Sequence, residues 1–539
     1  MPIELGNVAW PPVECHKPNR FYREWGAWYG GDPETLEAVY SESGYFTGTA
    51  VDKRYSATLG GGVRGALARL WWGRPTSSPG QPSVKLHIPA AGDLSMYAAD
   101  LLFGAPPEIT IGDPVKATSS DGVVLTSPSP ATERWQTISE EIGFDSRMLE
   151  GSEQGSAYGG IYLRASVLPK VNGWRPVEAP IVGAIPPDAA IPEWRGGFLT
   201  AVTFWREVGR TGGSALDKVK VWRHLERHEP GMVYHALYLG TPERLGEPMS
   251  LAASDATAEL VPAAKTGATG LAVEYVPNMR PHRLIRGTNL GRSDYAGAEP
   301  SMDALDETWS SWMRDIRLAK ARLVVPEALL QSNGKGEGAS FDADREIWAA
   351  IGGMPAPDAK MLTPVQFLIR VNEHRDTAAA ALRQIWRTAG YSVGENGEET
   401  EAQGAATATE VVSRGARTAA TRSRKIGYWQ PALRRLARAM LEMDMAAGFS
   451  RGLDLSGPIA VEFPPAVAPD PKQRAETLEL LGRAKFISTR TAVEELHPEW
   501  PEERVLQEVE AIEKATPEPD AFGDGPPPPV EDEEPPTEE

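Results

Sequence analysis

The chain has 539 residues, of which 41% are hydrophobic and 24% are charged, a balance typical of globular proteins and enough chain to bury several cores. Its net charge of -19 at pH 7 argues against binding nucleic acid through a general basic surface, because phosphate is repelled. The single cysteine, Cys15, excludes an internal disulfide, and the 8 histidines are scattered, so we expect no structural zinc site and no bound cofactor.

The N-terminal hundred residues show no sign of a secretory or membrane segment. Met1–Trp10 lacks the basic-then-apolar layout of a signal sequence, and no run of about 18 apolar residues occurs in the chain. We therefore expect a soluble protein made in the cytoplasm, with no membrane partner.

Aromatic residues are frequent in the first hundred residues, and we interpret them as core or subunit-contact anchors: Trp10, Phe21, Tyr22, Trp25, Trp28, Tyr29, Trp71 and Trp72.

Short runs of β-branched and aromatic residues follow between about Ile161 and Val276. Glycine pairs such as Gly196-Gly197 separate these runs and are typical of tight turns. The pattern predicts an antiparallel sheet.

Helical periodicity begins after Gly287. From Ser301, which could cap a helix, apolar residues recur at spacings of three and four up to Leu323. Pro326 then ends the pattern. This predicts a helical rod of about 22 residues, or ~33 Å.

A second rod of similar length is predicted from Thr363, as N-cap, with Pro364 at the first helical position, to Gly390. The segment that follows, residues 391–406, is polar, acidic and contains glycine, which is typical of a mobile loop.

The third helix is predicted to start at the capping box Thr407–Glu410, to kink at Pro431 and to end at Gly448. It is strongly basic although the chain is acidic. Its basic residues could form a solvated face, salt bridges between subunits, or a collar that contacts DNA phosphate. They are Arg414, Arg417, Arg422, Arg424, Lys425, Arg434, Arg435 and Arg438.

Short helices are predicted beyond Val461, one of them with a capping box at Thr491–Glu494. After Lys514 the chain has nine acidic and no basic residues and is rich in proline. Residues 515–539 are therefore predicted to be a disordered acidic tail, because they cannot bury enough apolar surface to offset their ordering entropy.

Sequence motifs for catalysis are weak. Gly60–Gly65 has the glycine spacing of a dinucleotide loop but lacks a preceding buried strand, so a flexible turn is the alternative. Gly448–Gly452 fits GxSxG, but a predicted helix precedes Ser450 and a predicted strand follows it, which inverts the context of a nucleophile elbow. Residues 332–336 lack the remaining positions of a P-loop.

Carboxylates near the start of the first rod, at Asp303, Asp306 and Glu307, are interpreted as solvated or capping groups. No acid and base pair can be singled out among them. We therefore predict no catalytic residues and no metal ligands.

The order of these elements, together with four stretches that span most of residues 20 to 512, resembles the portal proteins of tailed double-stranded-DNA bacteriophages. The resemblance is to the portal proteins of siphovirus-type phages, particularly those of actinobacterial phages. The stretches are Tyr97–Glu108 (YAADLLFGAPPE), Asn289–Arg322 (NLGRSDYAGAEPSMDALDETWSSWMRDIRLAKAR), Thr407–Leu441 (TATEVVSRGARTAATRSRKIGYWQPALRRLARAML) and Phe486–Ile512 (FISTRTAVEELHPEWPEERVLQEVEAI).

The resemblance implies an α+β, helix-rich portal fold whose wing, stem, clip and crown assemble into a ring. The wing would be residues 1–300, with an N-terminal helical part and a β-rich part from about 161. The other parts would be stem helices 301–323 and 364–389, clip 324–363, tunnel loop 391–406, a long kinked helix returning to the wing at 407–469, and crown 470–514.

The resemblance also implies a ring of typically twelve subunits at one capsid vertex of the virion, through which the genome enters and leaves. Implied partners are double-stranded DNA, terminase, the major capsid and scaffolding proteins, and head-completion or adaptor proteins of the tail connector. The protein would be a passive conduit, not an enzyme. Alternatives are another phage structural protein, such as a minor head protein, or a serine hydrolase that uses Ser450.

Two groups of residues are candidates for contact with DNA or with neighbouring subunits. The tunnel-loop group is Tyr391, Ser392, Glu395, Asn396, Glu398 and Glu399. The basic-helix group is Arg414, Arg417, Arg422, Arg424 and Lys425.

Overall fold

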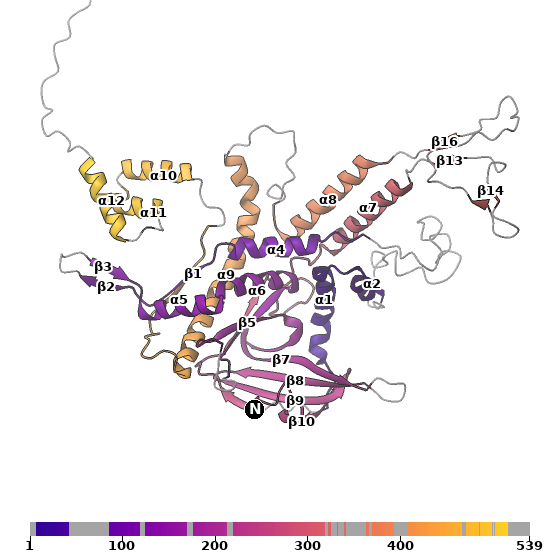
Figure 1. Cartoon of the computed structure of the whole chain (residues 1–539), viewed down its shortest axis with the longest axis horizontal. Helices are drawn as coiled ribbons and strands as arrows, with labels where there is room; N and C mark the ends of the chain where they lie inside the picture. The colour runs from indigo at the N-terminus through magenta and orange to yellow at the C-terminus, as the bar shows by residue number, and fades with distance from the viewer. Residues whose placement is uncertain are drawn as a thin grey trace, which may run out of the picture. The chain divides into compact units, whose positions relative to one another are not determined.

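The computed structural model describes residues 7–41, 86–118, 124–169, 176–212, 219–318, 322–324, 331–332, 339–340, 363–365, 369–392, 408–465, 471–484, 486–497, 500 and 502–515. The chain forms two compact units, Met1–Pro464 and Pro465–Glu539. Helices and antiparallel sheets both contribute to the first unit, and the second is helical (Figure 1). The predicted α+β, helix-rich class is confirmed.

The N-terminal half of the first unit contains helices with clear sequence determinants. Ser129 caps one of them by accepting a hydrogen bond from the Thr132 amide at 3.1 Å, and Pro130 occupies the first turn. Trp25 and Trp28 are fully buried, as expected for core anchors. The helices are α1 (Val13–Gly30), α2 (Pro33–Ser41), α4 (Ala90–Phe103), α5 (Pro130–Ile142) and α6 (Phe144–Tyr158).

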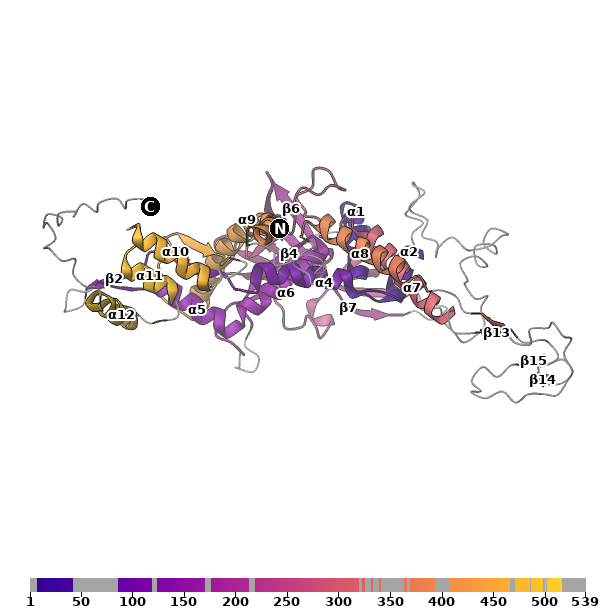
Figure 2. The same ribbon diagram turned by 90° about the horizontal axis from the view of Figure 1, so that it is seen from above.

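The predicted antiparallel sheet is confirmed, but it divides into two sheets (Figures 1 and 2). One has the order β12-β4-β5 and the other β10-β9-β8-β7-β6, with β11 paired to β9. Gly196 and Gly197 make the β6–β7 turn with positive φ angles, as their sequence predicts. The strands are β4 (Gly160–Ser166), β5 (Ile181–Ile185), β6 (Ala190–Arg195), β7 (Phe198–Thr211), β8 (Lys220–Glu229), β9 (Met232–Thr241), β10 (Arg244–Met249), β11 (Ala263–Lys265) and β12 (Val273–Pro277).

Shorter elements complete the first unit. Strand β1 pairs with β17, β2 with β3, and β14 with β15. Two 3-10 helices, η2 and η3, lie between strands. Their bounds are β1 (Glu108–Ile111), β2 (Val115–Thr118), β3 (Val124–Ser127), β14 (Gln331–Ser332), β15 (Ala339–Ser340), β17 (Ile459–Glu462), η2 (Pro187–Ala189) and η3 (Leu251–Ala253).

Two helices, α7 (Glu299–Leu318) and α8 (Val371–Ala389), lie side by side (Figures 1 and 2). They correspond to the two predicted rods, with different ends. The first helix begins before Ser301, and the second begins after Pro364. Between them, β13 (Arg322–Val324) pairs with β16 (Thr363–Val365), so Leu323 faces Pro364 in a ladder. The predicted starts at Ser301 and Pro364 are wrong, the second because local strand pairing outcompetes the helix signal of Thr-Pro.

The longest helix, α9 (Ala408–Ala447), contains Pro431 and continues through it. The kink predicted there stays a prediction, and Thr407 of the predicted capping box lies outside the described residues. Gly448 follows the helix with a positive φ angle, which confirms the predicted C-terminal glycine. From Trp429 onward, one face of α9 is buried in a core with α5, β1 and β4.

A second core joins α1 and α4 with the first part of α7 and the last part of α8. Trp25, Leu94, Leu305 and Ile385 are fully buried there. The segments just before α7 and just after α8 also pack in this core.

The second unit consists of α10 (Pro471–Arg483), α11 (Thr489–Leu496) and α12 (Glu502–Ala515), which confirms the short helices predicted there. The predicted capping box at Thr491 is wrong. Ser488 is the N-cap, accepting a hydrogen bond from the Thr491 amide at 3.1 Å, because the helix starts earlier. Glu494 pairs instead with Arg490 at 2.8 Å. The predicted acidic tail lies outside the described residues from 516 onward.

Candidate functional site

The helix pair α7–α8 is held by aromatic and polar contacts at the end away from the second core. Trp312 of α7 stacks on His374 of α8, with ring centroids 6.1 Å apart and planes 9° apart. Asp315 accepts hydrogen bonds from His374 Nε2 at 2.9 Å and Arg370 Nη2 at 3.1 Å. Hydrogen bonds from His374 and Arg370 hold the pKa of Asp315 below its usual value. Both helices are therefore fixed to each other at both ends.

A hollow of about 360 Å³ lies along this pair and is mostly polar. It is lined by Ala304, Glu307, Thr308, Ser311, Arg370, Glu373, His374 and Thr377. Threonine, serine and carboxylate side chains on a groove between helices suit contact with another polar surface better than enclosure of a small apolar ligand.

Asp294 lies just before α7 and is the centre of a buried polar cluster, which we call the junction: Ser156, Asn278, Asp294, Tyr391 and Lys425. One carboxylate oxygen of Asp294 accepts hydrogen bonds from Lys425 Nζ at 2.6 Å, Ser156 Oγ at 2.7 Å and Tyr391 OH at 3.1 Å. The other accepts from Asn278 Nδ2 at 2.8 Å. The junction thus joins α6, the segment after β12, the entry to α7, the exit from α8 and the middle of α9.

The charges of the junction are enclosed. Lys425 is 2% exposed and Asp294 is 1% exposed. Burial lowers the pKa of Lys425, and the Asp294 carboxylate opposes that effect. Burial and the same carboxylate raise the pKa of Tyr391 well above its usual value. Both charges of such a buried pair must be present, because a buried charge without its counter-charge destabilises the fold by several kcal/mol.

The start of the predicted tunnel loop is fastened to α9. Tyr391 is 1% exposed, and the Ser392 amide donates to Thr418 Oγ1 at 2.9 Å. Thr421 Oγ1 donates to the Gly390 carbonyl at 2.6 Å. Tyr391 is therefore a core residue and not a candidate for the channel wall, because its ring packs under α4 and its hydroxyl is committed to Asp294. Glu395, Asn396, Glu398 and Glu399 lie outside the described residues.

The basic residues of α9 mostly bind their own chain. Arg422 donates to the Leu101 carbonyl at 2.6 Å and the Pro464 carbonyl at 2.5 Å. Arg435 forms a bidentate pair with Glu274, at 2.9 and 2.8 Å.

Two further arginines each donate one hydrogen bond to a backbone carbonyl. Arg417 donates to the Arg387 carbonyl at 2.9 Å, and Arg438 reaches the Gly457 carbonyl at 3.4 Å. These contacts fix α9 onto α4, α8 and β12.

The predicted contact of this helix with DNA or another subunit does not hold for Lys425, because its ammonium group is buried against Asp294. Arg424 and Arg417 are exposed along the helix, so they are free to meet another surface with the rest of their side chains. The side chain of Arg414 lies outside the described residues.

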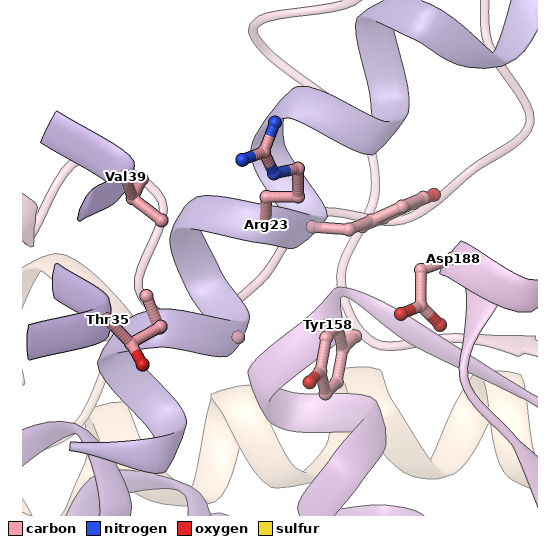
Figure 3. A pocket seen from close by; sticks show the side chains of 8 residues that line it. Arg23, Thr35, Val39, Tyr158 and Asp188 are labelled. Atoms are coloured by element: carbon pink, nitrogen blue, oxygen red, sulfur yellow. The ribbon is translucent and has the colours of Figure 1, made fainter. Parts of the chain in front are cut away.

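A second hollow of about 360 Å³ opens between α1, α2, α6 and η2 (Figure 3). Tyr158 and Asp188 face it (Figure 3). Burial raises the pKa of the Asp188 carboxyl. Over the described part of the chain no group of three or more His, Cys, Asp or Glu side chains could hold a metal ion.

Ser450 of the GxSxG motif lies in the loop between α9 and β17, as the sequence predicts. Its Oγ is buried and makes no hydrogen bond within the described residues. A serine nucleophile needs a base within hydrogen-bond reach, and none of the residues that the structure describes provides one for Ser450. The Gly60–Gly65 motif lies outside the described residues, as does most of 332–336.

Asp306 differs from its predicted role as a solvated or capping group. It is 3% exposed and accepts hydrogen bonds from the Ile88 amide and from His87 Nδ1, both at 2.9 Å. Asp306 therefore fixes the segment before α4 to α7, because that segment has backbone donors that need a buried acceptor.

None of the described helices is both long and apolar enough to cross a membrane.

Comparison with known families gives one match, to the family described as "Phage portal protein, SPP1 Gp6-like", over residues 273–518. The match contains α7, α8, α9, most of the junction and the helices α10, α11 and α12 of the second unit. No curated protein matches the chain.

Solved structures with partial similarity come from gene transfer agent particles. The neck of a native particle computed with C12 symmetry matches at 12% identity over 80% of this chain and 92% of that chain, with a TM-score of 0.37. The virion of a native particle matches at 13% identity over 81% and 99%, with a TM-score of 0.36. The neck of an empty particle matches at 12% identity over 76% and 90%, with a TM-score of 0.38. TM-scores this low indicate only a loose resemblance.

Proposed function

We propose, from the membership of residues 273–518 in the phage portal family, that the whole chain is the subunit of a portal ring. The family match supports the portal function predicted from the sequence. The likeness to siphovirus-type and actinobacterial phages stays a prediction.

The parts of the portal are proposed as follows. The pair α7–α8 forms the stem, because these two helices have nearly equal lengths of 20 and 19 residues and are joined through an insertion. Residues 319–370 then form the clip, 393–406 the tunnel loop, and α10–α12 the crown. The remainder of the first unit forms the wing. The observation that supports this division is the position of the family match over the helix pair, most of the junction and the helices of the second unit.

The junction gives the stem a fixed base. The same carboxylate of Asp294 binds the residue after α8 and the middle of α9, so the entry to the stem and the start of the tunnel loop are held on one helix. A buried and fully hydrogen-bonded cluster is a rigid one. Force applied to the loop by a moving duplex would therefore pass into α9 and the wing.

We propose that the ring has twelve subunits and stands at one vertex of the virion capsid, where DNA passes through it. Terminase supplies the energy, and the capsid, scaffolding and head-completion proteins bind the outside. A channel that DNA slides through should not hold phosphate, because each neutralised phosphate adds a contact that must be broken. The net charge of -19 fits such a conduit.

Electron microscopy of the purified full-length chain tests this function. We expect rings with a central hole, and no ATP hydrolysis by the purified ring. A preparation that stays monomeric at all concentrations, with α7 and α8 in a compact lobe, would contradict the portal assignment. Robust ATP turnover would contradict the passive conduit alone.

A further inference from the structure

Arg292 is a buried cation whose side chain has no partner among the residues that the structure describes. It lies in the segment between β12 and α7, where its amide donates to the Met279 carbonyl at 2.9 Å and the two residues form an isolated antiparallel bridge. The residue is 6% exposed. Its side chain makes no hydrogen bond or ion pair with any residue that the structure describes, and its Nε is enclosed without an acceptor. Its terminal nitrogens, unlike Nε, are not enclosed.

Other positive charges surround it. Burial, Arg283 and Arg424 all lower the pKa of Arg292, while Asp294 opposes them. Arg424 Nη1 lies 3.9 Å from Met279 Sδ, which places this guanidinium over the same bridge. Arg283 and Arg424 are exposed. We call Arg283, Arg292 and Arg424 the arginine recess.

The Asp294 carboxylate, which acts on Arg292, already has a partner. Asp294 binds Lys425 at 2.6 Å in the junction. Its negative charge is therefore shared between the Lys425 ammonium group, which it contacts, and the Arg292 guanidinium. The surroundings of Arg292 therefore keep an excess of positive charge. Burying such a cation is unfavourable unless an anion binds it, and a guanidinium fork fits the two oxygens of a carboxylate or phosphate.

We propose that the arginine recess binds an acidic side chain of a second copy of this chain, so that the site is completed when subunits assemble. This inference rests on the proposed ring. In a closed ring each interface joins two different patches of the same chain, so a basic recess on one face requires an acidic patch on the other. Each copy has 74 acidic and 55 basic residues, a surplus of carboxylates.

DNA phosphate is the other oxyanion in such an assembly, and it fits less well. Three clustered arginines would hold the backbone and oppose its sliding, whereas a permanent contact between subunits gains from them. A charge pair enclosed between subunits also lowers the dissociation rate more than it raises the association rate.

Assembly of the full-length chain with Arg292→Met tests the proposal. Methionine keeps the length of the side chain and removes its charge, so the isolated subunit should be as stable as the wild type or more stable. The protein concentration at which half of the chains are in rings should rise about tenfold or more, as expected for loss of a pair worth ~1.4 kcal/mol or more at each interface. The measurement is mass photometry across a dilution series, at low and high salt, with melting temperatures of the subunits.

The matched control is Arg195→Gln, which removes an exposed positive charge at the end of β6 and should leave the assembly midpoint unchanged. The double variant Arg283→Gln with Arg424→Gln should weaken assembly in the same direction as Arg292→Met. In a density map of the wild-type ring, a carboxylate of the neighbouring copy should lie within hydrogen-bond distance of Arg292.

Two results overturn the proposal while leaving the portal function intact: rings of Arg292→Met that form and resist salt like the wild type, or a ring map in which the recess faces no other copy. Anisotropy of labelled duplex DNA separates the phosphate alternative. If Arg292→Met assembles normally but loses DNA binding, the ligand is phosphate and the proposal is wrong. A wild-type chain that never forms rings overturns the proposal and the portal function together.

Discussion

Asp294 accepts four hydrogen bonds from side chains that are distant in sequence. Asn278 and Ser156 each use a neutral donor, and Lys425 adds the only charge in direct contact. The oxygen that binds Lys425 also binds Tyr391, so the cluster is one cooperative network. Its residues stabilise one another more than separate pairs would.

Removing either charge of the junction should strongly destabilise the first unit. For Lys425→Met or Asp294→Asn we expect a loss of about 3–5 kcal/mol, because the remaining group stays buried without its counter-charge. The double variant should lose less than the sum of the two. Urea denaturation followed by tryptophan fluorescence measures the effect.

The matched control is Arg435→Gln, which breaks a partly exposed ion pair with Glu274. Such pairs contribute about 0–1 kcal/mol. Equal losses for Arg435→Gln and Lys425→Met would show that enclosure of the junction is not what stabilises it.

Strands β8 and β9 carry a histidine cluster. Arg206 Nε donates to His224 Nδ1 at 3.3 Å, so the His224 proton is on Nε2, which lies 3.1 Å from His235 Nδ1. On the same strand, His228 Nε2 donates to Glu226 at 2.7 Å. Burial lowers the pKa of His224 to about 4 and also lowers that of His235. Burial alone would raise the pKa of Glu226. The hydrogen bond from His228 and the positive charge of Arg164 outweigh this effect and hold the pKa well below its usual value.

The cluster predicts that acid destabilises the first unit. A histidine whose pKa is lower in the folded state contributes fully above its unfolded pKa of about 6.5, and the contribution is lost as the pH falls from there toward about 4. The lowered pKa of Glu226 acts in the same direction at still lower pH. For His224 alone the loss should reach up to about 3 kcal/mol.

Thermal melts at a series of pH values measure this dependence. His224→Gln should flatten the slope between about pH 6.5 and 4, whereas His16→Gln, at an exposed position on α1, should not. An unchanged slope in His224→Gln would rule out this histidine as its origin.

The ends of the helices show how elements compete. Thr363 and Pro364 form a good helix start by local rules, yet they lie in β16 opposite Arg322–Val324. Proline tolerates an edge strand, so the pairing costs little. Strand β16 ends at Val365, and α8 begins at Val371.

The end of α8 depends on Gly390 in the same way. Its φ angle is +101°, and a Cβ there would lie 2.9 Å from Thr421 Oγ1 of α9. Gly390→Ala should therefore destabilise the first unit by about 1–3 kcal/mol, and should displace the start of the tunnel loop from α9. Hydrogen exchange of the Ser392 amide and urea denaturation measure both effects.

Gly427→Ala provides the matched control, because its Cβ would meet nothing within 4 Å on a helical segment of α9. Alanine there should stabilise the chain by up to about 1 kcal/mol. If both substitutions had the same effect, the backbone conformation of Gly390 would not be the cause.

At the scale of the whole molecule, the chain divides into a large mixed unit and a small helical one. Among the described residues the large unit has four hydrophobic clusters. One lies around α9 and another around α1, α4, α7 and α8, and the junction connects segments of these two. The family match begins at residue 273, within β12, so it takes in the helix pair and α9 but not the six-stranded sheet. Arg283 and Arg292 of the arginine recess lie near the start of the matched region, and Arg424 lies within it on α9.

The sequence alone determined the element types, because periodicity, turn glycines and caps are local signals: the antiparallel region from Ile161 to Val276, two rods, and the long basic helix. It also predicted a portal protein, and the portal family model matches residues 273–518. Only the tertiary structure decided what the charged residues do. Lys425 stands on the stripe of α9 that includes Thr418, Thr421 and Trp429, a local sign of burial, but its partner is 131 residues away. Asp294 and Arg292 carry no local signal, since burial of a charge depends on which distant segments pack around it.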